Sequence, residues 1–391
     1  MSSSATIQPG HSLVPVATVI GITTVSSLVA NTLPAFLAVI ATERGYSESQ
    51  AGLCAMADMG GMAIGIIGCA MLPKLVQLLN WRQTVRLGLL LVILANLLSI
   101  VATDFAPYFV VRLVAGVGAG LVIAITYAVL GEGGGARSIG FFNIGQLGAG
   151  WLAIPYFTPL AEAYGVKSIF ELIAVFSVFA SLFTVFLPLG SCHLVTEASP
   201  SRVHQKISKA GWTAILACFL FWIGVGSIFG FLSFMGISWG GDPVAVEDSV
   251  SKVLFAGMTG AVAVTIIGSQ FGAFRSSVIA CVGLLASVAL FLYFNPVAAF
   301  MAIGALFYFC VTVSTSYQFE VVTQVDSSNS AAMMVMAATV AAISVGPAIA
   351  GYLVTPTYDL INGLGFVFIA VSLALTAVSI RMSKGQAVIK A

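Results

Sequence analysis

Twelve apolar segments, each about as long as a membrane-spanning helix, follow one another along this chain of 391 residues. A helix needs about 20 apolar residues to cross the hydrocarbon core of a bilayer. Cutting at polar residues and at Pro and Gly places the segments at 13–41, 49–73, 84–103, 107–131, 138–161, 168–189, 212–237, 251–273, 277–294, 297–320, 330–354 and 361–380. Lipid cannot satisfy an open backbone, and the alternation of barrel strands is absent, so all twelve are expected to be helices.

Composition supports an integral membrane protein surrounded by lipid. The chain is 59% hydrophobic and 7% charged, whereas soluble domains carry about 25% charged residues. The charges form no basic stripe, so we expect no nucleic-acid partner. The six cysteines include no CxxC pair, and five of them lie in apolar segments, where a free cysteine behaves as a small hydrophobe. We therefore expect no disulfide framework, no metal site and no cofactor.

One long polar connection, 190–211, divides the chain into an N-terminal half, 1–189, and a C-terminal half, 212–391. Each half contains six of the apolar segments. The halves share short patterns in the same order and at a nearly constant offset: Phe105-Ala-Pro107 with Phe294-Asn-Pro296, Thr126-Tyr127 with Ser316-Tyr317, and Pro155 with Pro347. We therefore expect a parallel repeat of two six-helix bundles related by a pseudo-twofold axis.

The distribution of Lys and Arg predicts the orientation, because cytoplasmic loops carry an excess of both. With both termini in the cytoplasm, eleven basic residues lie inside: Lys74, Arg82, Arg86, Arg137, Arg202, Lys206, Lys209, Arg275, Arg381, Lys384 and Lys390. Only three lie outside, namely Arg44, Lys167 and Lys252. The first apolar segment is longer than a signal-peptide core and follows no Lys or Arg, so we interpret it as a retained span. The predicted location is the cytoplasmic (inner) membrane.

Between Tyr108 and Glu132 the chain contains a single charge, Arg112, within an otherwise apolar span. Gly116 and Gly120 follow at intervals of four residues, so they share a helical face with Arg112 and allow a neighbouring helix to approach closely. With Gly118 these residues form an Arg-x3-Gly-x-Gly-x-Gly run. The run resembles the fourth transmembrane helix of the major facilitator superfamily. Arg112 lies near the end of its segment, and the alternative to burial is that it snorkels to the membrane surface.

The resemblance to the major facilitator superfamily covers the whole chain in layout, since both have twelve spans, a central cytoplasmic loop and two parallel halves. It implies a transporter with its site near the middle of the membrane. Gly346-Pro347 and Gly351 are similar to an element of the superfamily's drug antiporters, but that element usually lies in segment 5, where this chain has Ile154-Pro155. The superfamily's loop after segment 2 normally carries an Asp that is missing here. No subfamily is therefore assigned.

Asp58 is the outstanding acid within the apolar segments, and it lies in segment 2, followed by Gly61 and Gly65. Ionisable groups inside a membrane are rare and usually functional. We hypothesise that Asp58 is the protonation site of a coupled transporter and that Arg112 sets its pKa. The alternative is a permanent Asp58–Arg112 pair that only fixes helix packing.

Polar and aromatic residues near the middle of segments 1, 4, 5, 7, 10 and 11 are candidates for the wall of a substrate cavity. They are Thr24, Asn31, Tyr127, Asn143, Gln146, Trp151, Trp222, Phe229, Tyr308, Thr312 and Met336. Any one of them could instead simply pack or face lipid. No second basic residue accompanies Arg112, so an aromatic, amphipathic or weakly charged organic molecule fits better than a highly charged anion. Pro34, Pro155 and Pro347 can break or bend their helices during alternating access.

Glu132 and Glu320 end segments 4 and 10 at equivalent places in the repeat, and basic residues lie in nearby loops: Arg82 and Arg86 for the first and Arg275 for the second. In transporters of this type such pairs latch the cytoplasmic gate. The alternative is a set of ordinary solvated charges at helix ends, where exposed pairs contribute roughly 0–1 kcal/mol.

These observations favour a monomeric secondary transporter, coupled to protons, that moves a small organic solute. Sodium coupling is not excluded, and neither export nor uptake is favoured. A membrane enzyme is disfavoured, because the three histidines lie outside the spans and no HExxH motif or phosphate-binding loop appears. A receptor or sensor on a transporter scaffold remains an alternative, although the tail after Arg381 is short for a signalling domain. Nothing in the chain resembles the filter of a channel.

Overall fold

The computed structural model describes residues 13–71, 80–133, 136–187, 206–268, 270–293, 297–355 and 357–390, and most of them are helical. Ten helices in these ranges are long and apolar enough to cross a membrane. The first and fifth predicted segments are covered by consecutive shorter helices, so helices cover most of each predicted segment within the described residues. The prediction of an all-α fold is confirmed.

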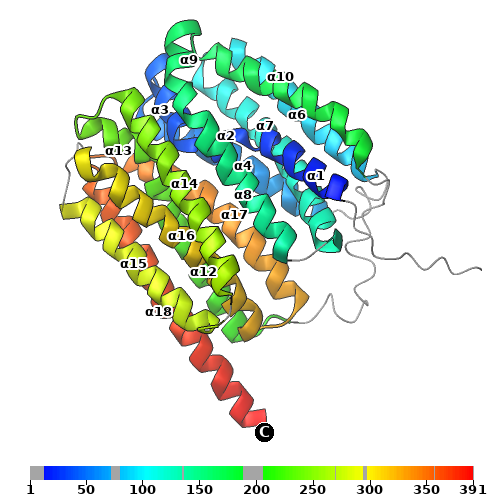
Figure 1. Cartoon of the computed structure of the whole chain (residues 1–391), viewed down its shortest axis with the longest axis vertical. Helices are drawn as coiled ribbons and strands as arrows, with labels where there is room; N and C mark the ends of the chain where they lie inside the picture. The colour runs from blue at the N-terminus through cyan, green and yellow to red at the C-terminus, as the bar shows by residue number, and fades with distance from the viewer. Residues whose placement is uncertain are drawn as a thin grey trace, which may run out of the picture.

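The N-terminal helices form one bundle in Figure 1, coloured blue to green. Within it, α7 packs against α1, α4 and α6, and α10 packs against α1 and α6. The bounds are α1 Leu13–Ser26, α2 Leu28–Asn31, α3 Leu33–Arg44, α4 Glu48–Met71, α6 Trp81–Val101, α7 Phe105–Gly133, α8 Ala136–Ala153, the 3₁₀ turn η1 Ile154–Tyr156, α9 Phe157–Tyr164, α10 Lys167–Phe183 and the 3₁₀ turn η2 Thr184–Phe186.

The C-terminal helices form a second bundle beside the first (Figure 1). Here α12 packs against α17 and α18, while α16 packs against α14 and α15. The bounds are α12 Lys209–Gly230, α13 Leu232–Ser238, α14 Pro243–Ile267, α15 Ala273–Tyr293, α16 Val297–Val325, α17 Asn329–Tyr352 and α18 Asp359–Lys390. Most of the predicted connection 190–211 lies outside the described residues, which resume at residue 206.

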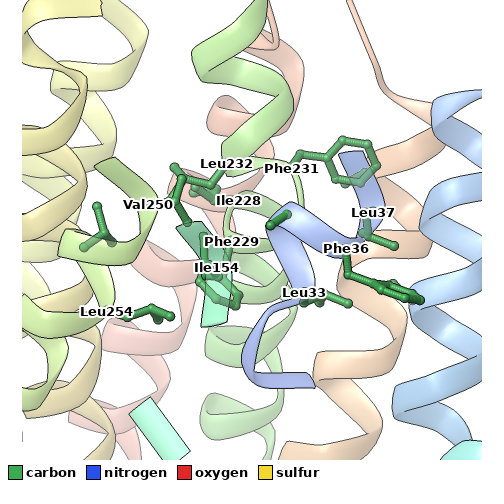
Figure 2. Close-up of a cluster of buried hydrophobic side chains, with 14 of the residues drawn as sticks. Leu33, Phe36, Leu37, Ile154, Ile228, Phe229, Phe231, Leu232, Val250 and Leu254 are labelled. Atoms are coloured by element: carbon green, nitrogen blue, oxygen red, sulfur yellow. The ribbon is translucent and has the colours of Figure 1, made fainter. Parts of the chain in front are cut away.

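The two bundles meet along α4 and α17, along α8 and α14, and where α3 contacts α12 and α13. A cluster of buried apolar side chains crosses this interface (Figure 2). Leu33, Phe36 and Leu37 come from α3, Ile154 comes from η1, and the labelled residues from the other bundle are Ile228, Phe229, Phe231, Leu232, Val250 and Leu254. In lipid such contacts hold helices together mainly through close van der Waals packing.

Two predicted spans are broken by identifiable residues. In the first, Ser27 and Thr32 separate α1, α2 and α3, and Pro34 stands in the first turn of α3. In the fifth, Pro155 lies in η1 between α8 and α9. Proline lacks the N–H that a helix interior requires, but it is tolerated in a first turn. By contrast, Pro347 lies inside the continuous helix α17.

The eighth segment was predicted at 251–273, and this position is wrong, since α14 spans Pro243–Ile267. Asp242 caps the helix by accepting a hydrogen bond from the backbone N–H of Ala245 (3.1 Å), and Pro243 occupies the first turn. Gly268, with φ of 54°, ends it. Glu247, Asp248 and Ser249 therefore belong to a helix, although they fall between the predicted segments 212–237 and 251–273.

We call the end of the molecule that carries connections 45–47, 165–166 and 239–242 the distal end, and the end that carries 206–208 and 326–328 the terminal end.

At the terminal end, Asp326 accepts hydrogen bonds from the backbone N–H groups of Ser208 (2.7 Å) and Ser328 (3.0 Å). Partial burial acts to raise the pKa of Asp326, but these hydrogen bonds outweigh it and hold that pKa below its usual range. Asp326 thus ties the start of α12 to the connection between α16 and α17.

Replacing Asp326 by Ala is expected to lower the free energy of unfolding by about 1 kcal/mol, because both hydrogen bonds are lost. A lowered pKa contributes stability above the pKa of the unfolded chain, about 3.9, and this stability disappears as the pH falls through the folded value. Apparent melting temperatures in detergent between pH 3 and pH 8 would therefore show a deficit that shrinks in acid. A deficit equal at both pH values would contradict this role.

Candidate functional site: a buried ion pair between α4, α6 and α7

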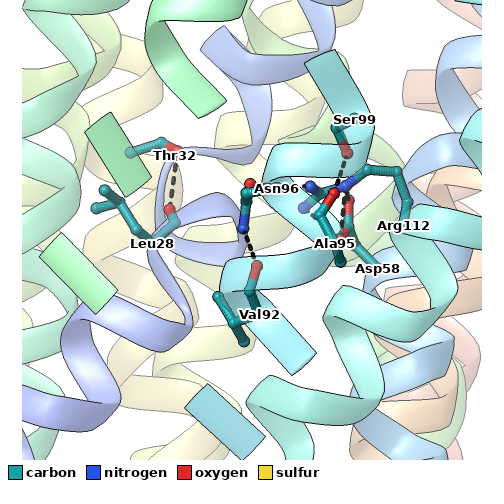
Figure 3. A network of polar contacts seen from close by, with 8 residues as sticks. All are labelled: Leu28, Thr32, Asp58, Val92, Ala95, Asn96, Ser99 and Arg112. Atoms are coloured by element: carbon teal, nitrogen blue, oxygen red, sulfur yellow. Dashed lines mark hydrogen bonds and ion pairs between the residues drawn. The ribbon is translucent and has the colours of Figure 1, made fainter. Parts of the chain in front are cut away.

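Asp58 of α4 and Arg112 of α7 form a buried ion pair with several hydrogen bonds (Figure 3). The Nη2 of Arg112 lies 2.7 Å from Oδ1 of Asp58, and its Nε lies 3.0 Å from Oδ2. Asp58 is 3% exposed and Arg112 is 1% exposed. Arg112 therefore does not snorkel to the membrane surface. Such a pair neutralises two charges that would otherwise be very costly inside a membrane.

Asn96 of α6 completes the site, and the sequence analysis did not include it. Its Oδ1 accepts a hydrogen bond from Nη1 of Arg112 (3.2 Å), and its Nδ2 donates one to the backbone carbonyl of Val92 (2.8 Å). The rings of Phe36 and Phe170 lie 5.4 and 5.8 Å from the guanidinium carbon. These aromatic faces stabilise the cation further.

A cavity of about 10 Å³ adjoins the ion pair. It has room for roughly one water molecule. Asp58, Asn96 and Arg112 supply polar groups to its wall, and Ser26 and Ser27 at the break between α1 and α2 supply others. The carboxylate therefore borders a space in which a proton could be delivered through water. None of the eleven predicted cavity residues lines this space.

Glycines bring the helices close enough for the ion pair to form. A Cβ added at Gly116 would lie 2.1 Å from the backbone oxygen of Asp58, and one added at Gly120 would lie 2.3 Å from that of Met62. Gly118 faces the other way, where an added Cβ would lie 2.5 Å from the backbone oxygen of Gly88 in α6. The Arg-x3-Gly-x-Gly-x-Gly run thus lets α7 pack tightly between α4 and α6.

Three of the predicted cavity residues belong to a second polar cluster, which joins α1, α2 and α8. The Oε1 of Gln146 accepts hydrogen bonds from Nδ2 of Asn31 (2.6 Å) and from Oγ of Ser27 (2.7 Å), and its Nε2 donates to Oγ1 of Thr24 (3.3 Å). Gln146 is buried, while Thr24 and Asn31 are partly buried. Uncharged groups of this kind can form hydrogen bonds with a polar solute when the helices separate.

The remaining cavity candidates make contacts in several places, within the bundles and between them. Across the interface between the bundles, the ring of Trp151 lies 5.1 Å from that of Phe255. Within the C-terminal bundle, Phe229 lies 4.9 Å from Tyr308. The others make contacts with nearby side chains or glycines. The ring of Tyr127 packs against Phe142 and that of Trp222 against Phe221, while Thr312 lies opposite Gly257 and Gly260. Met336 packs on a buried apolar cluster that includes Ala214 and Cys218 of α12, and Asn143 of α8 is partly buried.

The predicted gate residues do not pair with each other in the part of the chain that the structure describes. Arg82 donates from Nε to the carbonyl of Leu187 (2.6 Å), and Arg86 donates to Oγ1 of Thr184 (2.9 Å). Arg275 is exposed, and Glu320 accepts from Gln324 (3.1 Å). The side chain of Glu132 lies outside the described residues.

Gly346 and Pro347 contribute to close packing around α17. A Cβ added at Gly346 would lie 2.7 Å from the backbone oxygen of Ile223 in α12. The backbone oxygen of Pro347 lies against α4, where a Cβ added at Gly52 would approach it to 2.3 Å. One turn nearer the distal end, a Cβ added at Gly351 would lie 2.6 Å from the backbone oxygen of Glu48. These contacts bring the two bundles together at the distal end.

Solved structures of transporters have the same fold. A mutant of the nucleoside transporter NupG superposes with a TM-score of 0.76 at 13% identity, covering 95% of this chain and 100% of that one. The D-xylose-proton symporter gives a TM-score of 0.68 at 12% identity, covering 92% and 96%. A further NupG structure gives 0.66 at 14% identity, covering 95% and 98%. No family model and no curated protein matches the sequence. The chain has the major facilitator fold, and the prediction of an all-α integral membrane protein is confirmed.

Proposed function

We propose that the protein is a secondary active transporter that moves a small organic solute by alternating access and couples this movement to protons through Asp58. The observation that carries the proposal is the buried Asp58–Arg112 pair beside a water-sized cavity. Protonation of Asp58 would remove the negative charge that holds Arg112, and Arg112 would then be held only by weaker neutral contacts such as that with Asn96. A proton could thereby change how α4, α6 and α7 pack.

The solute is expected to be uncharged or weakly charged. Around Gln146 the available groups are amides and hydroxyls, and Trp151 with Phe255 adds aromatic surface at the interface between the bundles. The neighbours in fold are named for a nucleoside and for D-xylose, which are uncharged and rich in hydroxyl groups. Sodium coupling, either direction of transport, and a receptor built on a transporter scaffold remain alternatives.

The proposed setting is a monomer in the cytoplasmic membrane with both termini in the cytoplasm, as the Lys and Arg distribution predicts. The terminal end would then face the cytoplasm and the distal end the outside. We also propose that the two bundles, 1–189 and 212–391, move as units about their interface while 190–211 connects them. The distal contacts between α4 and α17 support a state that is closed toward the outside.

Asp58→Asn is expected to abolish solute-driven proton flux in proteoliposomes. The asparagine keeps an oxygen that accepts a hydrogen bond from Arg112, so the variant should fold, but it cannot bind and release a proton. The assay uses a pH-sensitive dye and a panel of uridine, D-xylose, aromatic acids, amines and hydrophobic cations. Proton movement with the solute would indicate symport, and movement against it antiport.

Asp248→Asn is the matched control, because Asp248 is an exposed aspartate that pairs with Lys252 four residues away. It should keep the wild-type flux. Normal coupling in folded Asp58→Asn would contradict the proposed role and leave the ion pair with a packing role. Replacing the proton gradient with a sodium gradient distinguishes the alternative coupling ion.

A further inference from the structure

A second buried carboxyl lies at the interface between the bundles, far from Asp58 in the sequence. Glu247 stands in the second turn of α14 and is 1% exposed. Its Oε1 accepts a hydrogen bond from Oγ1 of Thr158 (2.6 Å), and its Oε2 accepts one from the backbone N–H of Thr158 (3.1 Å). Thr158 belongs to the first turn of α9 in the opposite bundle. The side chain therefore bridges the two bundles near the distal end.

The contact is the distal part of a continuous stripe on α14. Toward the middle of the molecule, Ser251 donates a hydrogen bond to the backbone carbonyl of Trp151 (2.7 Å), and Leu254 and Met258 lie opposite Gly150 and Gly148 of α8. These residues recur at helical spacing, so one face of α14 packs on α8, η1 and α9. Separation of this face from the other bundle at the distal end would expose Glu247 to water.

The surroundings of Glu247 are apolar or acidic. Val250 on the same face of α14 and Ile154 of η1 belong to the apolar cluster in Figure 2. The charged group that acts on Glu247 from α9 is Glu162, another acid. On α14 itself, Asp248 is paired with the nearby Lys252. The remaining titratable groups on the packed elements are Tyr156 of η1, Tyr164 of α9, Asp242 at the cap of α14, Arg137 of α8, and Tyr308, Cys310, Tyr317 and Glu320 of α16. The side chain of Arg137 lies outside the described residues.

These surroundings differ from those of Asp58, which is paired with a guanidinium. A carboxyl that loses its water without gaining a cation favours its neutral form, and the two donors of Thr158 offset this only in part. When the distal face opens, water reaches Glu247 and the charged form is favoured again. Closure and protonation are thus linked, and each stabilises the other.

We infer that Glu247 is a second proton-binding site, which takes up a proton when the distal gate closes over it and releases the proton when that gate opens. The inference rests on the proposed transport function, because it supposes that the two bundles separate at the distal end. Glu247 lies between the two bundles and therefore couples the position of the distal gate to pH, whereas the site of Asp58 lies within the N-terminal bundle. The proton is exchanged with water at the distal surface, and no covalent step is involved.

The test measures the distance across the distal end at different pH values and requires no transported compound. Spin labels are placed at Tyr164→Cys of α9 and Val244→Cys of α14, both of which are exposed. Cys192 is replaced by Ser, and the five other cysteines are buried. Double electron–electron resonance on the full chain in lipid nanodiscs then reports the closed and open populations between pH 5 and pH 9.

In the spin-labelled chain without further substitutions, we expect the population with the longer label-to-label distance to be small at pH 5. This population should increase at least about threefold by pH 9, since one linked proton can shift a population up to tenfold per pH unit. Glu247→Gln mimics the protonated side chain and should keep the short distance at every pH. Asp248→Asn, one residue away and exposed, should keep the response of the otherwise unchanged chain.

Thr158→Val provides a second variant in which Glu247 is retained. It removes a hydroxyl that stabilises the charged carboxylate only in the closed state, so the charged closed state loses stability and the pH midpoint of opening should move downward. A pH response that persists in Glu247→Gln, or that is absent from the otherwise unchanged chain, would overturn the inference. A response lost in Asp58→Asn but kept in Glu247→Gln would overturn it too. None of these results bears on the flux assay for Asp58, so the two proposals can fail separately.

Discussion

Replacing Asp58 by Leu is expected to destabilise the protein more than replacing Arg112 by Met. Either change breaks the buried pair, and removal of one partner of such a pair typically costs about 3–5 kcal/mol. The two residues that remain behave differently, however. A carboxyl without its partner can bind a proton and become neutral, whereas a guanidinium stays charged at any pH that the protein tolerates. Arg112 without Asp58 would remain a buried cation, with Asn96 and two aromatic rings as its neighbours.

A double-mutant cycle measures this difference. Asp58→Leu combined with Arg112→Met leaves no charge at the site, so its loss of stability should be smaller than that of Asp58→Leu alone. The measurement is the apparent melting temperature in detergent at pH 5 and pH 8. The deficit of Arg112→Met should be smaller at pH 5, where protonation removes the unpaired charge, and that of Asp58→Leu should not change with pH. Additive deficits would show that the two side chains do not stabilise each other.

The sequence predicted the architecture well, because lipid imposes strong rules on a spanning chain. Apolar length marked all twelve segments, and the rarity of charge within them singled out Asp58 and Arg112. The glycine spacing on α7 predicted a tightly packed face, and the structure places Gly116 and Gly120 against α4. These features depend on local patterns, which can be recognised without knowing the contacts between distant segments.

Features that depend on contacts between distant segments were missed. Glu247 falls between the predicted segments 212–237 and 251–273, because the segments were cut at polar residues and at Pro and Gly. Asp242 and Pro243 instead begin a helix there. Asn96 was missed for a different reason: a single amide in an apolar span gives no sign of its partner until α6 is placed beside α7. The cavity role of the eleven candidates remains a prediction, because mid-span position does not specify which face of a helix lines a cavity.

Gly65→Ala and Gly68→Ala, two identical substitutions in the same helix, are expected to have opposite consequences. An added Cβ at Gly65 would lie 2.5 Å from the backbone oxygen of Val117 and 2.9 Å from Cα of Gly120, and neither backbone atom can move without separating α4 from α7. At Gly68, three residues later, nothing lies within 4 Å of an added Cβ. Alanine there should be neutral or slightly stabilising, because it favours helix more than glycine does by about 1 kcal/mol.

The loss in Gly65→Ala is expected to be about 1–3 kcal/mol, the usual cost of overpacking. Because α4 and α7 carry Asp58 and Arg112, separation of the helices should also lengthen the ion pair. Gly65→Ala should therefore lose coupled proton flux even at temperatures where it remains folded, while Gly68→Ala keeps it. Melting temperature and flux measured on both variants test the two parts of this argument together. Equal melting temperatures and equal flux for the two variants would show that the contact between α4 and α7 is looser than the glycines imply. They would also show that the position of Asp58 beside Arg112 does not depend on this contact.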